Sequence, residues 1–367
     1  MADLHPTDSE TIKLAAQTWF FVGGEYVEDE HGVQLEGAAY VEHYEPETCT
    51  QPYPVVMFHG GVQTGTNFTS TPDGRRGWLH DFLRAGYTVY VFEQPERGRS
   101  GHALDVVNRA DLMRYDAVRV ERMFTAPAAS AAWPQARHHT QWPGSGCRGD
   151  ASFDNFFASQ VPMLKDRDEI ERLTRNAGVA LLDRIGPAIL LTHSQSGPFG
   201  WLLGDARPEL VRGIIALEPN GPPFFEVEFQ GGEDFFRYAE ELSRPYGITR
   251  QPLTFDPPID TACELQPTLS EMPDNPELVR GFLQQEPARK LTSLAGIPIL
   301  ILVAEASYHA SYDHCTSAFL TQAGVPHYYV ALADVGLKGN GHMAMLEENN
   351  HETADVMLQW LEDQYDA

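Results

Sequence analysis

The sequence predicts an α/β fold in which a mostly parallel, doubly wound sheet follows an N-terminal antiparallel hairpin. Short apolar runs alternate with segments of helical periodicity along most of the chain, a pattern typical of strands joined by right-handed crossover helices. The runs contain few polar residues, which indicates strands buried on both faces of a sheet. Hydrophobic residues make up 42% of the 367 residues, an ordinary share for a globular protein with a core of its own.

The predicted elements follow in a regular order. Residues 12–22 and 33–44 predict the opening hairpin, because a glycine-containing acidic turn separates them. The later strands are predicted at residues 54–58, 88–92, 188–192, 211–217, 297–303 and 327–331, and the helices at residues 77–84, 168–185, 197–205, 316–323 and 354–363.

Two long stretches interrupt this order, residues 103–154 and residues 219–295. Both are rich in proline, glycine and aromatic residues, and loops of this length in a compact domain are usually functional. We therefore expect one domain over residues 1–367, with the two insertions forming a cap over the active site.

The charge of the chain argues against some partners. With 52 acidic and 26 basic residues, the formal net charge is −26, and such a field repels nucleic-acid phosphates and anionic membrane surfaces. The four cysteines are widely spaced, so no metal site is expected, although a single disulfide is left open. We expect neither nucleic acid nor membrane as a partner.

The N-terminal segment predicts the location. It lacks the basic and apolar regions of a secretory signal, and no apolar run is long enough to span a bilayer. We expect a cytoplasmic protein, or a secreted or periplasmic one if a signal has been removed.

Ser194 is the predicted nucleophile. It follows a buried strand and precedes a helix, the setting of a nucleophile elbow, whose tight turn needs small residues two positions before and after the serine. Thr192 and Ser196 occupy those positions, so the G-x-S-x-G pattern is not matched literally. In the alternative interpretation, Ser194 or Ser196 only caps the helix. His193 is expected to pack behind the turn.

Acyl transfer also needs backbone N–H groups that stabilise negative charge on the carbonyl oxygen. One is expected from Gln195, which follows the nucleophile. The other is expected from Gly61, in the glycine pair after an earlier strand, because glycine lets the backbone approach the substrate closely. Val62 is the alternative if the loop is offset by one residue.

His342 is the predicted general base. It lies between the last strand and the final helix, as the triad order Ser, acid, His requires. His309 and His314 are competitors, but they follow an earlier strand.

The acid has three candidates. Glu218 ends an apolar strand, where a charge is costly unless it is hydrogen-bonded, whereas Glu305 and Asp313 follow the next strand. Position favours Glu218, although a surface glutamate before a proline turn would look the same.

With these residues identified, the chain resembles bacterial esterases of the α/β-hydrolase superfamily that use a Ser-Glu-His triad with the glutamate after the sixth strand. The likeness rests on the elbow and on further segments, namely His59-Gly60, Thr71-Pro-Asp-Gly-Arg-Arg-Gly-Trp78, Phe82-Leu-Arg-Ala-Gly-Tyr87, Arg97-Gly-Arg-Ser100, Glu218-Pro219, Gly339-Asn-Gly-His-Met343 and Asn349-Asn350. The resemblance implies an α/β-hydrolase fold with Ser194, Glu218 and His342 as the triad and with Gly61 and Gln195 as the oxyanion donors.

The chain departs from this family pattern in the oxyanion loop. The family carries adjacent cysteines at the positions of Gly61 and Val62, where a disulfide stiffens the loop, and this bond cannot form here. The insertion at residues 219–295 also looks larger than the family pattern, so substrate preference is not inherited from it.

We expect a carboxylic-ester hydrolase, an esterase or lactonase, that forms an acyl-enzyme and needs no metal or organic cofactor. Its partner would be a small-molecule ester or lactone, and a homodimer is compatible with the sequence. Aromatic residues of the second insertion, including Phe224, Phe225 and Tyr246, predict a largely apolar pocket for a bulky hydrophobic substrate. The alternatives are a non-hydrolytic acyltransferase or cyclase with the same triad, and a non-catalytic ligand receptor on the same fold.

Overall fold

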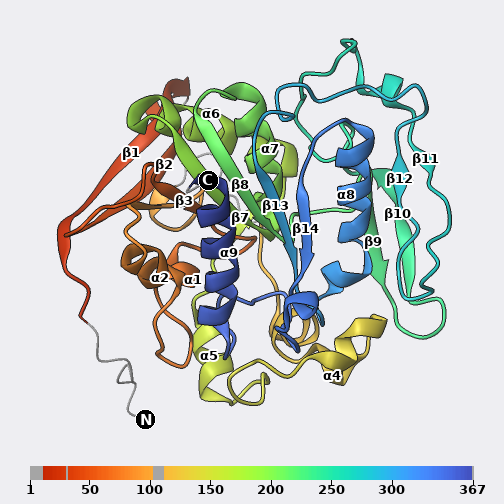
Figure 1. The fold of residues 1–367 in the computed structure, drawn as a ribbon, viewed down its shortest axis with the longest axis horizontal. Coiled ribbons are helices and arrows are strands. Elements are labelled where there is room, and N and C mark those ends of the chain that lie inside the picture. The colour runs from red at the N-terminus through yellow and green to blue at the C-terminus, as the bar shows by residue number, and fades with distance from the viewer. Residues whose placement is uncertain (1–10, 30–31, 102–110, 366–367) are drawn as a thin grey trace.

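The computed structural model describes residues 11–29, 32–101 and 111–365 (Figure 1). Eight strands form one sheet in the order β1-β2-β4-β3-β7-β8-β13-β14. β2 pairs antiparallel with β1 and with β4, and the pairs from β4 through β14 are parallel. The predicted mostly parallel sheet with an antiparallel hairpin is therefore confirmed. The strands are β1 Leu14–Asp29, β2 Gly32–Pro46, β3 Val55–Phe58, β4 Val89–Phe92, β7 Ala188–His193, β8 Val211–Leu217, β13 Ile299–Val303 and β14 Tyr328–Ala331.

Helices cover both faces of this sheet because successive side chains of a buried strand point to opposite faces. Val56 and Leu190 contribute to the core beneath α6, α7 and α8, whereas Val55 and Ile189 contribute to the core beneath α2 and α9. The helices are α1 Thr66–Thr69, α2 Trp78–Arg84, α3 Ala117–Val120, α4 Pro127–Ser130, α5 Ala151–Ala158, α6 Arg167–Ile185, α7 Gly197–Ala206, α8 Asp313–Gln322 and α9 Asn350–Tyr365.

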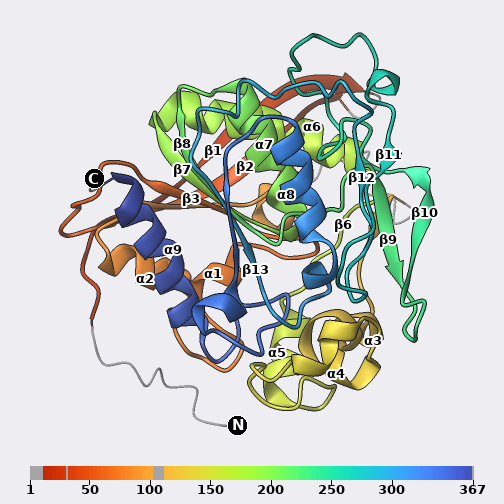
Figure 2. The same cartoon turned by 45° about the vertical axis from the view of Figure 1, so that its right-hand side comes forward.

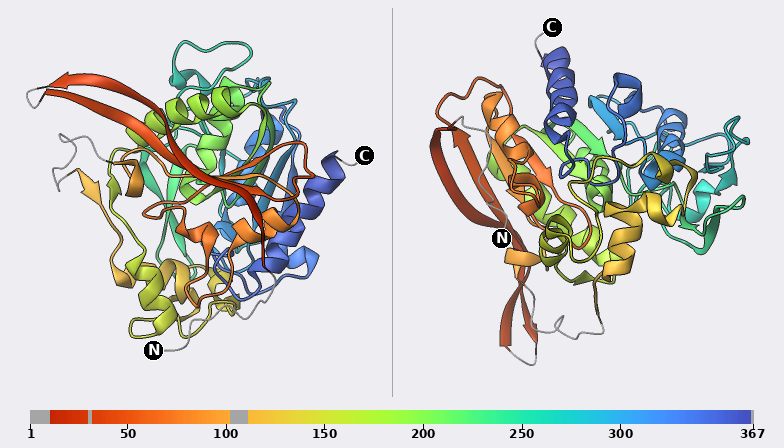
Figure 3. Two further views of the ribbon diagram at one scale, coloured as in Figure 1. Left: turned by 90° about the vertical axis from the view of Figure 1, so that its left-hand side faces the viewer. Right: turned by 90° about the horizontal axis from the view of Figure 1, so that it is seen from below.

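The opening hairpin extends past the sheet and crosses α6 (Figure 3). Gly23 makes this crossing possible, since a Cβ at this position would lie 2.9 Å from the Cα of Ala177. The backbone of Gly23 also has a φ of +67°, which side chains disfavour.

The two insertions lie at different places around the strand ends. The first contributes α3, α4 and α5, which lie together at one end of the molecule, and its residues 103–110 fall outside the described residues (Figure 2). The second contributes short strands beside α8. These short strands are β9 Phe225–Phe229, β10 Phe236–Leu242, β11 Thr268–Leu269 and β12 Phe282–Leu283, and a further small pair joins β5 Leu112–Met113 to β6 Met163–Leu164.

Two expectations from the sequence concern features outside the sheet. All four cysteines are free, so the disulfide that the sequence left open is absent. Among the described helices, none combines the length and apolar character needed to cross a bilayer.

Candidate active site

Ser194 lies in a tight turn between β7 and α7. Its backbone has a φ of +56°, a conformation that is strained for a residue with a side chain and that clusters at functional sites. The turn is closely packed, because a Cβ on Gly197 would lie 2.4 Å from the Cβ of Pro219. Only glycine fits at position 197, so the turn needs a glycine directly after Ser196.

The two serines of the turn have different environments. Ser196 is fully buried, and its Oγ lies 2.8 Å from the carbonyl oxygen of Phe58 and accepts the N–H of His193 at 2.7 Å. It therefore ties β3 to β7. Ser194 is partly exposed and lines a cavity. Ser194 is thus the serine that a substrate can reach.

Glu218 and His342 form a buried pair at the carboxyl ends of the strands. His342 donates from Nδ1 to Glu218 Oε2 at 2.5 Å, which leaves Nε2 as an acceptor on the ring. Glu218 also accepts from the backbone N–H of Ala304 at 2.9 Å and from Ser307 Oγ at 2.7 Å. Its backbone has a φ of +47°, a conformation that is strained for a residue with a side chain.

Burial governs the protonation of this pair. Loss of solvent raises the pKa of Glu218 to about 7, against the donors from Ala304 and Ser307, which favour the ionised form. Burial lowers the pKa of His342 well below its usual value, and the neighbouring His309 lowers it further. The pair therefore holds a neutral imidazole at neutral pH, the form that a general base requires.

The other two candidate acids contact different groups. Asp313 Oδ1 lies 2.9 Å from Nδ1 of His309, whose Nε2 lies 3.1 Å from the hydroxyl of Tyr312. Glu305 accepts the backbone N–H of Gly339 at 2.8 Å. Of the three carboxylates, Glu218 alone is hydrogen-bonded to His342.

The loop that carries His342 is held by residues of the sequence segments used in the resemblance. Arg75 donates from Nη1 to the side chain of Asn350 at 2.6 Å and to the carbonyl oxygen of Glu347 at 3.0 Å. Trp78 donates to the carbonyl oxygen of Asn350 at 2.7 Å. Behind the base, His193 Nε2 donates to the carbonyl oxygen of His342 at 2.9 Å. These contacts fix the histidine loop against the sheet.

Gly61 and Gln195 lie next to each other beside Ser194. A Cβ on Gly61 would lie 3.4 Å from the side-chain oxygen of Gln195, and both residues line the same cavity as Ser194. Val62, the alternative donor, directs its N–H to the sulfur of Met163 at 3.3 Å. The geometry therefore favours Gly61 over Val62 as the second oxyanion donor.

A buried cation, which the sequence analysis did not identify, supports this loop. Arg97 is 1% exposed, and it donates to the carbonyl oxygen of Gly60 and to the side-chain oxygen of Gln195, both at 3.2 Å. Burial lowers the pKa of its guanidinium to about 9, so the group stays charged at neutral pH. The sequence carried two signals for it, its place in a glycine-containing loop after a strand and its membership of the Arg97-Gly-Arg-Ser100 segment of the resemblance.

Tyr308 is a second residue that the sequence did not identify. Its hydroxyl lies 3.1 Å from Nε2 of His342, the nitrogen that would receive the proton of Ser194. Burial raises the pKa of Tyr308 well above its usual value, although a hydrogen bond from Ser194 acts in the opposite sense. The phenol is therefore neutral and donates to His342.

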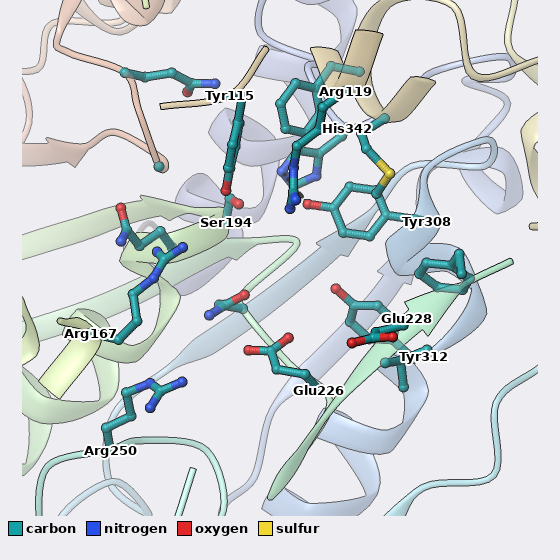
Figure 4. A pocket seen from close by; sticks show the side chains of 18 residues that line it. Tyr115, Arg119, Arg167, Ser194, Glu226, Glu228, Arg250, Tyr308, Tyr312 and His342 are labelled. Carbon is teal, nitrogen blue, oxygen red and sulfur yellow. Dashed lines mark hydrogen bonds between the residues drawn. The ribbon is translucent and has the colours of Figure 1, made fainter. Parts of the chain in front are cut away.

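The cavity beside Ser194 has a volume of about 410 Å³, within the range of small-molecule sites. Residues of the sheet ends and of both insertions line it, and Figure 4 shows charged and phenolic side chains pointing into it from several sides. The lining residues are Gly61, Gln63, Tyr115, Arg119, Met123, Phe124, Arg167, Ser194, Gln195, Asn220, Glu226, Val227, Glu228, Phe229, Arg250, Tyr308, Tyr312 and His342.

The expected substrate contacts at Phe224, Phe225 and Tyr246 are not found in this cavity. Phe224 is fully buried and packs edge-on against Phe319, and Phe225 packs against Phe282. Tyr246 packs against the core beneath α6, α7 and α8. These three aromatic residues anchor the insertion, and the expectation of a largely apolar lining is wrong because arginines and glutamates line the cavity together with other aromatic residues.

One group of side chains has the ligand types of a metal site. Ligand atoms of Glu218, His309 and His342 lie within 4.8 Å of one another. Each is already hydrogen-bonded, and both ring nitrogens of His309 are occupied by Asp313 and Tyr312. A metal ion would have to displace these hydrogen bonds, so the three side chains are better suited to the hydrogen-bonded arrangement than to metal binding.

The sequence of the chain is similar to that of a known protein. The chain is 43% identical to a fungal protein named "Probable secreted lipase phiG" (Fungal sp., strain ATCC 74256) over 364 residues, which cover 99% of this chain and 94% of the relative. The expected enzyme class, a carboxylic-ester hydrolase, agrees with that name. The expectation of a cytoplasmic protein is contradicted by this relative, which is named as secreted.

Solved structures and a family profile agree on the fold. A structure described as a novel bacterial esterase superposes with a TM-score of 0.64 at 22% identity, covering 98% of this chain and 99% of that one. The profile described as "Alpha/beta hydrolase family" matches residues 55–356, which include every candidate site residue named above. The chain belongs to the alpha/beta hydrolase family, as the resemblance in its sequence predicted.

Proposed function

We propose that the protein hydrolyses a carboxylic ester through an acyl-enzyme on Ser194, with His342 as general base and Glu218 as the acid. The observation that carries this proposal is the buried 2.5 Å contact between Glu218 and His342, at the wall of a cavity that Ser194 also lines. The lipase name of the fungal relative supports ester hydrolysis as the reaction.

The proposed reaction has two steps. Oγ of Ser194 attacks the ester carbonyl while its proton passes to Nε2 of His342, and the negative charge on the carbonyl oxygen meets the N–H groups of Gly61 and Gln195. The tetrahedral intermediate then expels the alcohol, which takes the proton from His342. In the second step water, deprotonated by His342, attacks the acyl-enzyme and releases the acid and Ser194.

Tyr308 has to yield Nε2 before the first step. Its hydroxyl lies on the nitrogen that Ser194 must use, so substrate entry would replace one hydrogen bond of His342 by another.

We also propose that residues 103–154 and 219–295 act together as the cap over this site. Support comes from the cavity lining, to which the first insertion contributes Tyr115 and Phe124 and the second contributes Phe229 and Arg250. A cavity of about 410 Å³ suits an ester or lactone of modest size better than the bulky hydrophobic substrate that the sequence predicts.

The test uses a fluorophosphonate probe and an ester panel that includes lactones. We expect covalent labelling at Ser194, and we expect Ser194→Ala to lose both the labelling and about 10⁶ in kcat, as other serine hydrolases do. Ser196→Ala is the matched control and keeps the labelling, because Ser196 is tied to the backbone. Labelling or turnover that survives in Ser194→Ala contradicts the proposal.

Product analysis separates the alternatives with the same triad. Hydrolysis releases a free acid in water, whereas an acyltransferase or cyclase yields a new ester without free acid. Binding without any labelling or turnover would identify a receptor.

A further inference from the structure

Three arginines line the cavity beside Ser194, namely Arg119, Arg167 and Arg250. They come from α3, from the first residue of α6 and from a loop of the second insertion. In the whole chain acidic residues outnumber basic ones by 52 to 26. A concentration of cations in one cavity of an acidic protein therefore calls for a specific partner of opposite charge, since partly buried charges are costly when they are not paired.

The two glutamates of the same cavity do not supply that partner. Glu226 is bound by Arg244, which is 1% exposed on its side chain and donates at 2.6 Å. Glu228 is bound by Arg237 at 2.7 Å. Neither Arg244 nor Arg237 lines the cavity, so each glutamate has its own arginine outside it.

The protonation of Glu226 supports this assignment. Burial favours its neutral form, but the charge and hydrogen bond of Arg244, with smaller contributions from Arg167 and Arg250, lower its pKa below the usual value. Glu226 is therefore ionised, and Arg244 already balances its charge. Arg167 and Arg250 remain as the excess positive charge on this side of the cavity.

Arg167 and Arg250 have weak partners within the protein. The guanidinium of Arg167 contacts the sulfur atoms of Met163 at 3.9 Å and Met113 at 3.7 Å, and no carboxylate of the described residues forms an ion pair with it. Arg250 lies 3.6 Å from Asp168, a longer separation than the 2.6 Å and 2.7 Å contacts that hold Glu226 and Glu228, and Asp168 is largely exposed, so this pair contributes little.

We propose that Arg167 and Arg250 bind an anionic group of the substrate, so that the enzyme acts on esters that carry a carboxylate. Figure 4 shows both side chains entering the cavity from the same side, with Arg250 pointing toward Glu226. Arginine recognises planar carboxylates through two parallel hydrogen bonds. Arg119, which is exposed and stacks on the ring of Tyr115 at 4.3 Å, lies where it can attract the anion as it enters. This inference rests on the proposed function, because it names the substrate class of the same site.

The experiment compares charged and neutral esters of similar length. Monoethyl adipate carries its carboxylate on the acyl side, and ethyl hexanoate is its neutral counterpart. 5-Acetoxypentanoate carries the carboxylate on the alcohol side, and pentyl acetate is the counterpart. Acid release in a pH-stat gives kcat/KM for all four. We expect kcat/KM of at least one charged ester to exceed that of its neutral counterpart tenfold or more. The charged ester with the larger preference shows whether the acyl or the alcohol half of the substrate faces Arg167 and Arg250.

Arginine variants test the assignment of the residues. Arg167→Met and Arg250→Met are expected to lower the charged-to-neutral ratio at least tenfold through KM, whereas Arg167→Lys retains only part of it, because lysine keeps the charge but not the two parallel hydrogen bonds. Arg172→Met is the matched control on the same helix, because Arg172 pairs with Glu169 on the surface and does not line the cavity. Rising salt should weaken the preference, since it screens the attraction.

Two outcomes overturn the inference while leaving the proposed function intact. In one, the neutral ester is hydrolysed as well as the charged one and the ratio is unchanged in both methionine variants. In the other, a fifth ester that carries a quaternary ammonium group in place of the carboxylate is preferred over the neutral ester, which would make Glu226 and Glu228 the recognition groups. Failure of the proposed function looks different, because then no ester is turned over and Ser194 is not labelled.

Discussion

The imidazole rings of His309 and His342 lie face to face, with their centroids 4.8 Å apart and their planes 7° apart. Each ring has its own buried carboxylate, since Glu218 bonds to His342 and Asp313 bonds to His309. Burial lowers the pKa of His309 to about 4, although Glu218 acts against this. His309 is therefore neutral above a pH of about 4, so its repulsion of a charged His342 ring is confined to acid solution.

This arrangement predicts different effects for the candidate acids. Glu218→Gln should lower kcat by about 10⁴, because the amide can neither stabilise the imidazolium nor fix the tautomer of His342. Asp313→Asn and Glu305→Gln should stay within about tenfold of the wild type, since their partners are His309 and Gly339. Steady-state kinetics of the three variants on one ester provide the measurement. Wild-type turnover in Glu218→Gln would assign the acid to another residue.

Tyr308→Phe should move the acid limb of the pH profile to higher pH. The Tyr308 hydroxyl donates to Nε2 of His342, and a donor on this nitrogen favours the neutral imidazole. Its loss raises the pKa of His342, so activity is lost at a higher pH as the solution is acidified. The measurement is kcat/KM against pH, which reports the free enzyme.

Tyr312→Phe is the matched control for this prediction, because its hydroxyl contacts Nε2 of His309 instead. An equal shift in both variants, or a shift to lower pH in Tyr308→Phe, would show that Tyr308 does not act through the hydrogen bond to His342.

The sequence predicted the sheet, which the structure confirms, and it proposed triad positions that the structure brings to one end of the sheet, because both follow from local patterns. Apolar runs between helical segments specify buried parallel strands, and the order of Ser194, Glu218 and His342 along the chain follows the strand ends. Position along the chain favoured Glu218 as the acid but left Glu305 and Asp313 open, and the structure shows that Glu218 bonds to His342 while Asp313 bonds to His309. Glu218 and His342 lie 124 positions apart in the sequence, so their hydrogen bond is apparent only in the folded protein.

The insertions were predicted less well, for a physical reason. Aromatic residues are equally suited to anchor a segment and to line a pocket, and the composition does not separate the two roles. Phe224 is 0% exposed, so this ring serves the core. The charged lining includes Arg167 and Glu226, which lie 59 positions apart in the sequence and are brought to one cavity only by the fold.

Arg97→Met should lower kcat about 10-fold to 100-fold with little change in KM. Arg97 bonds to the carbonyl oxygen of the peptide whose N–H belongs to Gly61, and also to Gln195. Losing a charged hydrogen bond costs about 1.5–3 kcal/mol, and here the loss would loosen the donors that meet the oxyanion. The rate of fluorophosphonate labelling should fall in parallel.

Arg97→Lys should recover part of the lost rate, because an ammonium can replace one of the two bonds. Circular dichroism and thermal unfolding show whether each variant is folded. A folded Arg97→Met enzyme with unchanged kcat would mean that Arg97 has no positioning role.

Glu171→Gln should stabilise the protein above pH 7 and have little effect at low pH. Burial raises the pKa of Glu171 to about 7 from its usual value of 4.5, even though it accepts the N–H groups of Arg250 and Gln251. Between these two values the folded protein binds more protons than the unfolded chain, so the free energy of unfolding falls as the pH rises. A shift of this size corresponds to about 3 kcal/mol. The glutamine oxygen can accept both N–H groups at every pH without ionising.

Urea unfolding at pH 5 and pH 8 measures this effect. We expect the difference between Glu171→Gln and the wild type to grow from a fraction of a kcal/mol at pH 5 to about 3 kcal/mol at pH 8. Glu169→Gln on the same helix is the control, because Glu169 is partly exposed and pairs with Arg172, and its difference should stay small at both pH values. A difference for Glu171→Gln that is the same at pH 5 and pH 8 would mean that Glu171 is already ionised in the folded protein at pH 5.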